Sequence, residues 1–291
     1  MTKLLHSRRL WIAAVVVLVG LSAPWWLSAY FLGVLTTAYY FGVFAMSWDL
    51  LFGFAGMVNF GPTFLIGLGA YGAAILNAEA GMPIPVCLVF GTFISLIGGV
   101  LLALPAMRLR GAYFGLITLV AVLLMQYAIV IFAHVTGGEI GMTVPSVLSI
   151  DATTNYLYAL IFMVICGIVL YGLSRSAIGL ILEATGQDDI EAAALGFNVA
   201  KHRLAAFCIS AALSGLAGGM LVFYLGAASI DTVIDLSIGV HIIIASVLGG
   251  RRAIRGALIG AIVLLLADEL QRPLAQHNTF VVSGWGRAEI M

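Results

Sequence analysis

The sequence predicts an all-α, polytopic membrane protein, and three observations support that prediction. Of the 291 residues, 63% are apolar and 9% are charged, whereas soluble domains average about 45–50% and about 25%. The mean hydropathy is +1.14, and the apolar residues fall into runs close to the roughly 20 residues that cross a bilayer as a helix. The 13 basic and 13 acidic residues cancel, so no net field indicates a nucleic-acid partner. These properties exclude a soluble enzyme.

Nine apolar runs are long enough, or nearly so, to cross a membrane. They cover residues 10–28, 30–52, 62–78, 84–104, 112–134, 156–173, 204–225, 237–250 and 256–270. We expect one transmembrane domain over residues 1–270 and a polar C-terminal tail over 271–291. The apolar patch from Phe280 to Trp285 is too short to cross, so the tail is expected to be interfacial or disordered.

The charges of the loops predict the orientation. If the N-terminus is cytoplasmic, 11 of the 13 basic residues lie inside, and only Arg272 and Arg287 lie outside. The loops assigned to the outside, around Glu79, 139–151 and 231–235, contain acids and no Lys or Arg. Because Lys and Arg concentrate in cytoplasmic loops, we expect a cytoplasmic N-terminus.

The N-terminal apolar run and the three cysteines are expected to have structural roles. The first run follows three basic residues, and we expect it to be a first span rather than a cleaved signal. Cys87, Cys166 and Cys208 lie in separate apolar runs without metal-ligand spacing, so we expect core residues and no metal site.

Small residues form stripes within the predicted spans. Ala211, Gly215 and Gly219 lie four residues apart in the seventh run, as do Gly69 and Ala73 in the third. Such stripes let helix backbones approach closely where lipid supplies no hydrophobic drive. We expect Gly215 and Gly219 to pack helices together, within the chain or, as the less favoured alternative, against a partner subunit.

Residues 53–62, GFAGMVNFGP, interrupt the helical pattern at the expected cytoplasmic end of two spans. Irregular backbone at membrane depth is tolerated only where protein or a water-filled cavity covers it. A broken or re-entrant helix and an ordinary Gly-rich loop explain this stretch equally well. Asn59 is its one strong hydrogen-bonding side chain.

Few polar side chains lie within the spans, which makes those few candidates for a solute pathway. We select Asn59, Thr118 in the fifth run and His241 in the eighth. For His241, a satisfied structural histidine is the favoured alternative, since no acidic partner can be assigned from the sequence. The scarcity of ionisable groups argues against a proton-driven pump.

The longest inside loop, residues 174–203, has the sequence of two short helices. Ser176 can cap the first, Asp188 or Asp189 can cap the second, and a glycine follows each. In the second, Ile190, Ala194 and Phe197 recur at i, i+4 and i+7. We expect this narrow apolar face to lie in a groove of another protein; a solvated connector or interfacial helix is the alternative.

The segment that contains the second helix has the sequence DDIEAAALGFN over residues 188–198. Its acidic pair, Ala-rich turn and Leu-Gly resemble the coupling helix of permease subunits of ATP-binding-cassette importers, and more narrowly the LivM branch of branched-chain amino acid permeases. Other stretches agree in order and spacing, so the resemblance covers residues 30–270. They are Asn59-Phe60-Gly61, LRGAYF over 109–114, TGG with Gly141 over 136–141, LSGLAGG over 213–219 and VLGG followed by IRGALIGA over 247–261.

The resemblance implies a bacterial inner-membrane permease subunit for branched-chain or other amino acids, amides, urea or aromatic acids. Its implied partners are a LivH-like second permease, two cytoplasmic ATPases, a periplasmic solute-binding protein and membrane lipid. This chain has no Walker pattern, so it would be neither an enzyme nor a cofactor-binding chain, and its ATPase partners would use ATP and Mg. The residues implied for ATPase coupling are Asp188, Asp189, Ile190, Glu191, Ala192, Ala194, Gly196 and Phe197.

The sequence departs from the family pattern at three places. Gly186-Gln187 stand where Arg-Glu often precedes the acidic pair, and Arg251-Arg252 stand where the family usually continues Gly-x-Gly. The family would also have one more span. The alternative function is an ATP-independent secondary carrier or channel; a charged filter or an internal repeat would favour it, and the sequence shows neither.

Overall fold

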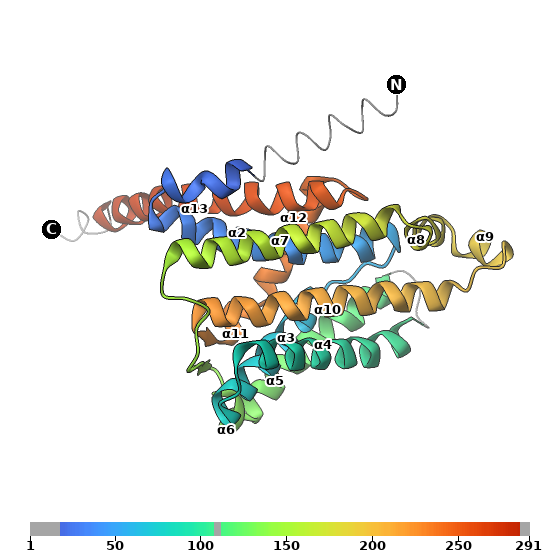
Figure 1. Ribbon diagram of the computed structural model, residues 1–291, viewed down its shortest axis with the longest axis horizontal. Coiled ribbons are helices and arrows are strands. Elements are labelled where there is room, and N and C mark those ends of the chain that lie inside the picture. The colour runs from blue at the N-terminus through green and yellow to red at the C-terminus, as the bar shows by residue number, and fades with distance from the viewer. Residues whose placement is uncertain (1–17, 108–111, 286–291) are drawn as a thin grey trace.

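The computed structural model describes residues 18–107 and 112–285, with side chains for 18–107 and 113–271. Within these residues nearly all regular structure is helical, and seven helices are long and apolar enough to cross a membrane. Figure 1 shows the long helices side by side along the long axis of the molecule. The predicted fold class, an all-α polytopic membrane protein, is confirmed.

The long helices account for most of the chain. They are α2 (Ala29–Asp49), α3 (Pro62–Ala80), α4 (Ile84–Ala106), α5 (Ala112–Ile131), α7 (Ala152–Arg175), α10 (Val199–Leu225), α12 (Leu236–Gly249) and α13 (Ile254–Trp285). The short elements are a 3-10 turn (Ala23–Trp25), a π-helical turn η2 (Leu50–Phe54), α6 (Ala133–Thr136), α8 (Ala177–Gln187), α9 (Asp189–Ala194), α11 (Ile230–Val233), β1 (Met142–Thr143) and β2 (Ala227–Ala228). The two strands pair antiparallel, with Met142 opposite Ala228.

The spans differ from the prediction at both ends of the chain. Seven of the nine predicted runs correspond to the seven candidate spans, while of the first run, 10–28, the structure describes residues 18–28. The ninth lies in α13, which continues as helix to Trp285 instead of ending at residue 270. The backbone of residues 271–285 is therefore helical rather than disordered, and an interfacial location of this tail stays a prediction. Polar residues such as Gln and Arg end an apolar run, yet they are good helix formers.

The core is built from two groups of helices. One consists of α3, α4 and α10, which pack against one another, with α5 against α3 and α4. The other consists of α2, α7, α12 and α13, and the contact between α2 and α10 joins the groups. Figure 1 shows α10 between the second group and the other helices of its own group, with α8 and α9 beyond the ends of the long helices.

Small residues allow the tight contact of α3, α4 and α10. A Cβ atom on Gly69 would overlap the backbone of Gly215, and one on Gly215 would overlap the side chain of Ser95. A Cβ on Gly219 would lie 2.9 Å from Leu88. The Ser95 hydroxyl can donate to the carbonyl oxygens of Leu65 (2.8 Å) and Ala211 (2.9 Å). Both glycines selected from the sequence thus lie in a contact within the chain.

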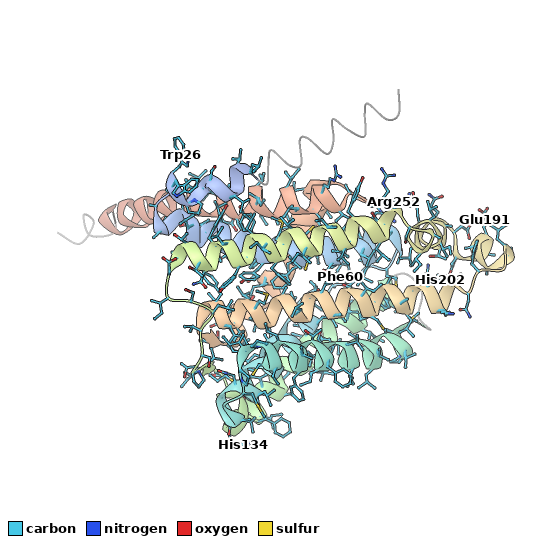
Figure 2. All side chains as sticks on the ribbon, in the orientation of Figure 1. Trp26, Phe60, His134, Glu191, His202 and Arg252 are labelled. Atoms are coloured by element: carbon cyan, nitrogen blue, oxygen red, sulfur yellow. The ribbon has the colours of Figure 1, made fainter. Side chains whose placement is uncertain are left out.

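Charge separates the two ends of the bundle. The six Lys and Arg residues whose side chains are described all lie at the end that carries α8 and α9, and they are Arg175, Lys201, Arg203, Arg251, Arg252 and Arg255. Figure 2 labels Arg252, Glu191 and His202 at this end and Trp26 and His134 at the other. We call the first the basic end.

Candidate coupling region and solute pathway

Two side chains cap the N-termini of the short helices at the basic end. The Ser176 hydroxyl accepts a hydrogen bond from the backbone N–H of Gly179 (3.4 Å) at the start of α8. The Asp188 carboxylate accepts from the N–H groups of Ile190 (2.8 Å) and Glu191 (3.1 Å) at the start of α9. Side-chain caps satisfy N–H groups that have no partner in the first turn. The two predicted helices and their caps are confirmed.

Large apolar side chains are exposed on α9 and just after its end. Ile190 is 67% exposed, Leu195 75% and Phe197 37%, and Ala194 is exposed between them. Ala192 is the exception and is buried. Large apolar side chains gathered at a polar end of a protein mark an interaction surface. Leu195 lay outside the predicted helical face because α9 ends at Ala194, where the helical spacing stops.

Arg203 ties α9 and α8 to the start of α10. Its Nη1 lies 3.7 Å from Oδ2 of Asp189, and its Nη2 donates to the carbonyl oxygen of Thr185 (3.0 Å). The ion pair is partly exposed, so it contributes at most about 1 kcal/mol. It orients α9 more than it stabilises the fold. Two further coupling residues from the sequence, Glu191 and Gly196, are exposed, and Gly196 lies two residues after the end of α9 with φ 90°.

Gly186 places α8 directly on the end of η2 and on the irregular segment, residues 55–61, that leads from η2 to α3. A Cβ atom on Gly186 would overlap the carbonyl oxygen of Phe54. A Cβ on Gly56, whose φ is 68°, would lie 2.9 Å from both the Cα and the carbonyl oxygen of Gly186. No larger residue fits this contact. The departure from Arg to Gly at position 186 was the signal in the sequence, but its meaning depends on a contact distant along the chain.

Arg252 joins three elements at the basic end. Its backbone N–H donates to Oδ1 of Asp49 (3.2 Å), its Nε to the carbonyl oxygen of Gly53 (3.1 Å) and its Nη1 to Oε1 of Glu183 (3.2 Å). Arg252 therefore connects the end of α2, the turn η2 and α8. Its φ is 63°, in the left-handed region that favours glycine.

The irregular segment is held by hydrogen bonds inside the protein. The carbonyl oxygen of Asn59 accepts from Nε1 of Trp48 (2.6 Å), and Oδ1 of Asn59 accepts from the N–H of Gly61 (2.9 Å). The N–H of Phe60 donates to Oγ1 of Thr118 (3.0 Å) on α5. Asn59 and Thr118 are both buried. The segment is neither an exposed loop nor a re-entrant helix: α2 ends in a π turn and a buried irregular stretch leads to α3.

His241 lies apart from this pair. Its Nδ1 is 2.7 Å from the carbonyl oxygen of Ser237, and its Nε2 is 3.4 Å from Oδ2 of Asp268 on α13. Both side chains are about two-fifths exposed, at 40% and 41%. No acidic partner could be assigned to His241 from the sequence, because Asp268 approaches it only through the packing of α12 against α13. These contacts fit the structural role better than a place beside Asn59 and Thr118.

Several buried hydroxyls escaped the sequence analysis. Among the described side chains, Ser47 on α2, Thr63 on α3 and Ser246 on α12 are buried, and their hydroxyl oxygens have no hydrogen-bond partner. Serine and threonine are too common to stand out in an apolar run. Buried polar groups are normally paired with protein or water, so these three hydroxyls are candidates for contact with water or a passing solute.

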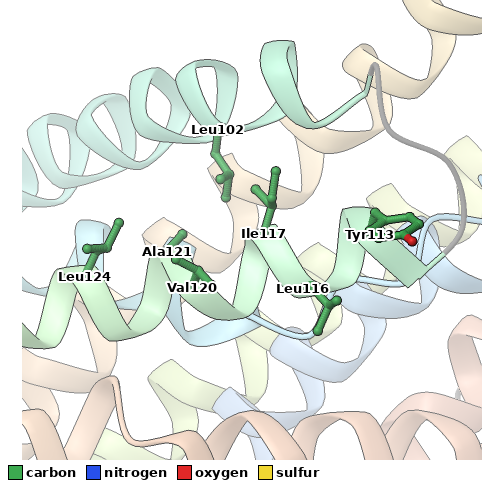
Figure 3. A pocket seen from close by; sticks show the side chains of 7 residues that line it. All are labelled: Leu102, Tyr113, Leu116, Ile117, Val120, Ala121 and Leu124. Atoms are coloured by element: carbon green, nitrogen blue, oxygen red, sulfur yellow. The ribbon is translucent and has the colours of Figure 1, made fainter.

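The groove between α4 and α5 is a poor site for a polar solute. Figure 3 shows Leu102 on α4 above the side chains of α5 that line it, among them Leu116, Ile117 and Leu124. Its volume is about 390 Å³, and the Tyr113 hydroxyl is the one polar side-chain group among its lining residues. An amino acid needs partners for two opposite charges. This groove suits an apolar occupant instead.

Comparisons with known proteins agree along most of the chain. Residues 30–284 match the family described as branched-chain amino acid transport system / permease component. Over 96% of its length, the chain is 24% identical to the high-affinity branched-chain amino acid transport system permease proteins LivM of Salmonella typhimurium and Escherichia coli, covering 72% of each. Over 34% of its length, it is 36% identical to the probable branched-chain amino acid transport permease protein LivH of Methanocaldococcus jannaschii, covering 30% of that protein. No solved structure matches.

Proposed function

Because this chain belongs to the branched-chain amino acid transport system / permease component family, we propose that it is the LivM-like permease subunit of an ATP-binding-cassette importer. The chain is a multi-pass inner-membrane protein. Its solutes are branched-chain amino acids or similar small molecules. The observation that carries the coupling part of the proposal is the capped α8–α9 unit, which presents exposed Ile190, Leu195 and Phe197 beyond the basic end.

The partners follow from the same proposal. A LivH-like permease forms the second half of the pathway, in keeping with the similarity of this chain to both LivM and LivH proteins. Two cytoplasmic ATPases bind α9 and its counterpart on the second permease, and a periplasmic protein delivers the solute. ATP and Mg are used by the ATPases, and this chain binds no cofactor of its own.

The contacts of α8 suggest how movement of the ATPases reaches the membrane domain. A displacement of α9 moves α8, which bears on Gly56 through Gly186 and on the turn η2 through Arg252. The irregular segment continues to Asn59 and is bonded to α5 at Thr118. Rigid-body rocking of helices about such contacts is a common switching mechanism. We place the coupling route along these contacts.

The test is purification of the tagged full chain from its native membrane in mild detergent, with bound proteins identified by mass spectrometry. We expect a second permease and ATPase subunits. The variant Ile190→Asp/Leu195→Asp should lose the ATPases and keep the second permease. Ile150→Asp is the matched control, because Ile150 is equally apolar and 98% exposed at the opposite end.

Two outcomes oppose the proposal. A folded chain recovered reproducibly alone would favour an ATP-independent carrier or channel. Undiminished ATPase binding by the Ile190→Asp/Leu195→Asp variant would remove α9 from the docking surface.

A further inference from the structure

A basic pocket opens at the basic end between the end of α7, the side of α8 and the start of α13. Its volume is about 650 Å³, and its polar lining residues are Tyr171, Ser174, Arg175, Glu183, Arg252 and Arg255. Glu183 is the one acid among the lining residues, and it pairs with Arg252 at 3.2 Å. Arg175 and Arg255 therefore give the pocket an excess of positive charge.

These two arginines converge on one aromatic ring. The guanidinium carbon of Arg255 lies 4.2 Å from the ring centroid of Tyr171, and that of Arg175 lies 5.8 Å from the same centroid. Contact with the face of a ring orients a guanidinium group without neutralising it. Among the described side chains, no carboxylate is in ion-pair contact with either arginine. Two like charges held near each other favour an anion between them.

An exposed apolar stripe leads from each arginine along its helix. On α7, Ile161, Ile165 and Ile168 recur at i, i+4 and i+7, and Arg175 follows seven residues after Ile168. Gly172, on the same face, has open space where a Cβ would lie.

The second stripe lies on α13, where Ile259 and Val263 follow Arg255 at i+4 and i+8 and are exposed. Residues at these spacings share one helix face. Because α7 and α13 contact each other, the two stripes lead toward one pocket.

We propose that this pocket binds the phosphate headgroup of an anionic phospholipid of the cytoplasmic leaflet. Arg175 and Arg255 contact the phosphate oxygens, and the acyl chains lie along the apolar stripes of α7 and α13. Basic pockets between helices at the cytoplasmic face are the usual place for anionic lipid headgroups. The stripes distinguish a lipid from free phosphate, because an inorganic ion gains nothing from exposed isoleucines.

The test is native mass spectrometry of the purified full chain with equal amounts of dioleoyl phosphatidylglycerol and dioleoyl phosphatidylcholine. We expect preferential retention of phosphatidylglycerol. Arg175→Gln/Arg255→Gln should reduce that preference by about tenfold, since each basic residue near the membrane surface strengthens the attraction. Lys201→Gln/Arg251→Gln is the matched control, because it removes two charges from the same end outside the pocket.

Two further arms separate the sources of the phosphate. Ile168→Ser/Ile259→Ser keeps both arginines and should also weaken phosphatidylglycerol retention, while inorganic phosphate should not displace the lipid. Displacement by inorganic phosphate, with no effect of the isoleucine variant, would assign the pocket to free phosphate and overturn the proposal. Equal retention by the arginine variant and its control would overturn it as well. The measurement uses neither solute nor ATP, so its failure leaves the proposed transport function intact.

Discussion

At the scale of single residues, Arg252 combines an unfavourable backbone with favourable contacts. A non-glycine residue in the left-handed region costs of order 1–3 kcal/mol and persists only where its surroundings enforce it. The resemblance to the family predicted glycine at this position, and the φ of 63° shows why glycine suits it. The arginine side chain offsets this cost by bonding Gly53 and Glu183.

Arg252→Gly separates these two effects. Glycine adopts the left-handed backbone without steric cost, which offsets the loss of the side-chain hydrogen bonds, so we expect little change in the thermal unfolding midpoint. The bridge to Glu183 and Gly53 is lost, so solute-stimulated ATP hydrolysis by the assembled complex should fall by about threefold or more, in the range of 0.5–2 kcal/mol for residues on a coupling route. Arg251→Gly, which removes the contact with Phe52 and leaves the Arg252 bridge in place, is the control. Equal stimulation in both variants would show that the Arg252 bridge transmits nothing.

The residues whose roles were predicted correctly bond neighbours close in the sequence, and those that were missed contact residues far away in the sequence. Ser176 and Asp188 could be identified as caps because each bonds N–H groups two or three residues away. Asp268 as the partner of His241 and Gly56 as the neighbour of Gly186 could not be identified, because only tertiary packing brings them together.

At the scale of elements, α9 has only six residues, so its helical form depends strongly on its cap. Short helices are marginal without such support. Removing a capping Asp costs about 0.5–2 kcal/mol, while Asn caps about as well as Asp. Asp188→Ala should therefore fray α9 and lower solute-stimulated ATP hydrolysis. Asp188→Asn should keep both the helix and the hydrolysis. If the Asp188→Ala variant shows normal solute-stimulated ATP hydrolysis, docking does not need a folded α9.

The contact of α3, α4 and α10 gives a second prediction for an element. Gly215→Ala places a Cβ in the space of the Ser95 side chain, and overpacking of this kind costs about 1–3 kcal/mol. We expect a lower thermal unfolding midpoint in detergent. Gly172→Ala is the control, because its Cβ meets open space.

A double variant tests whether the overlap itself is the cause. Ser95→Gly removes the atoms that a Cβ on Gly215 would strike, so it should lessen the effect of Gly215→Ala when the two are combined. Equal midpoints for Gly215→Ala and Gly172→Ala would mean that α4 and α10 have room to separate.

At the scale of the whole molecule, composition was enough to predict the fold class, and apolar runs located seven spans. The irregular end of α2 was predicted only as an interruption, because its form is decided by bonds to Trp48 and Thr118. Which polar residues share a pathway also depends on packing. The N–H of Phe60, the residue after Asn59, donates a hydrogen bond to Thr118. His241 instead contacts Asp268 on α13.

The orientation of the bundle is the prediction on which the docking proposal depends most. The basic residues at the α8–α9 end indicate that this end faces the cytoplasm. In a variant with Cys87, Cys166 and Cys208 replaced by serine, Leu195→Cys tests the basic end and Ile150→Cys the opposite end, since both positions are highly exposed. With a membrane-impermeant maleimide on intact cells whose outer membrane is permeabilised, Ile150→Cys should be labelled and Leu195→Cys should not. Inside-out vesicles should give the reverse. Labelling of Leu195→Cys from the periplasm would place α9 where no ATPase can reach it, and both the orientation and the coupling role of α9 would have to be abandoned.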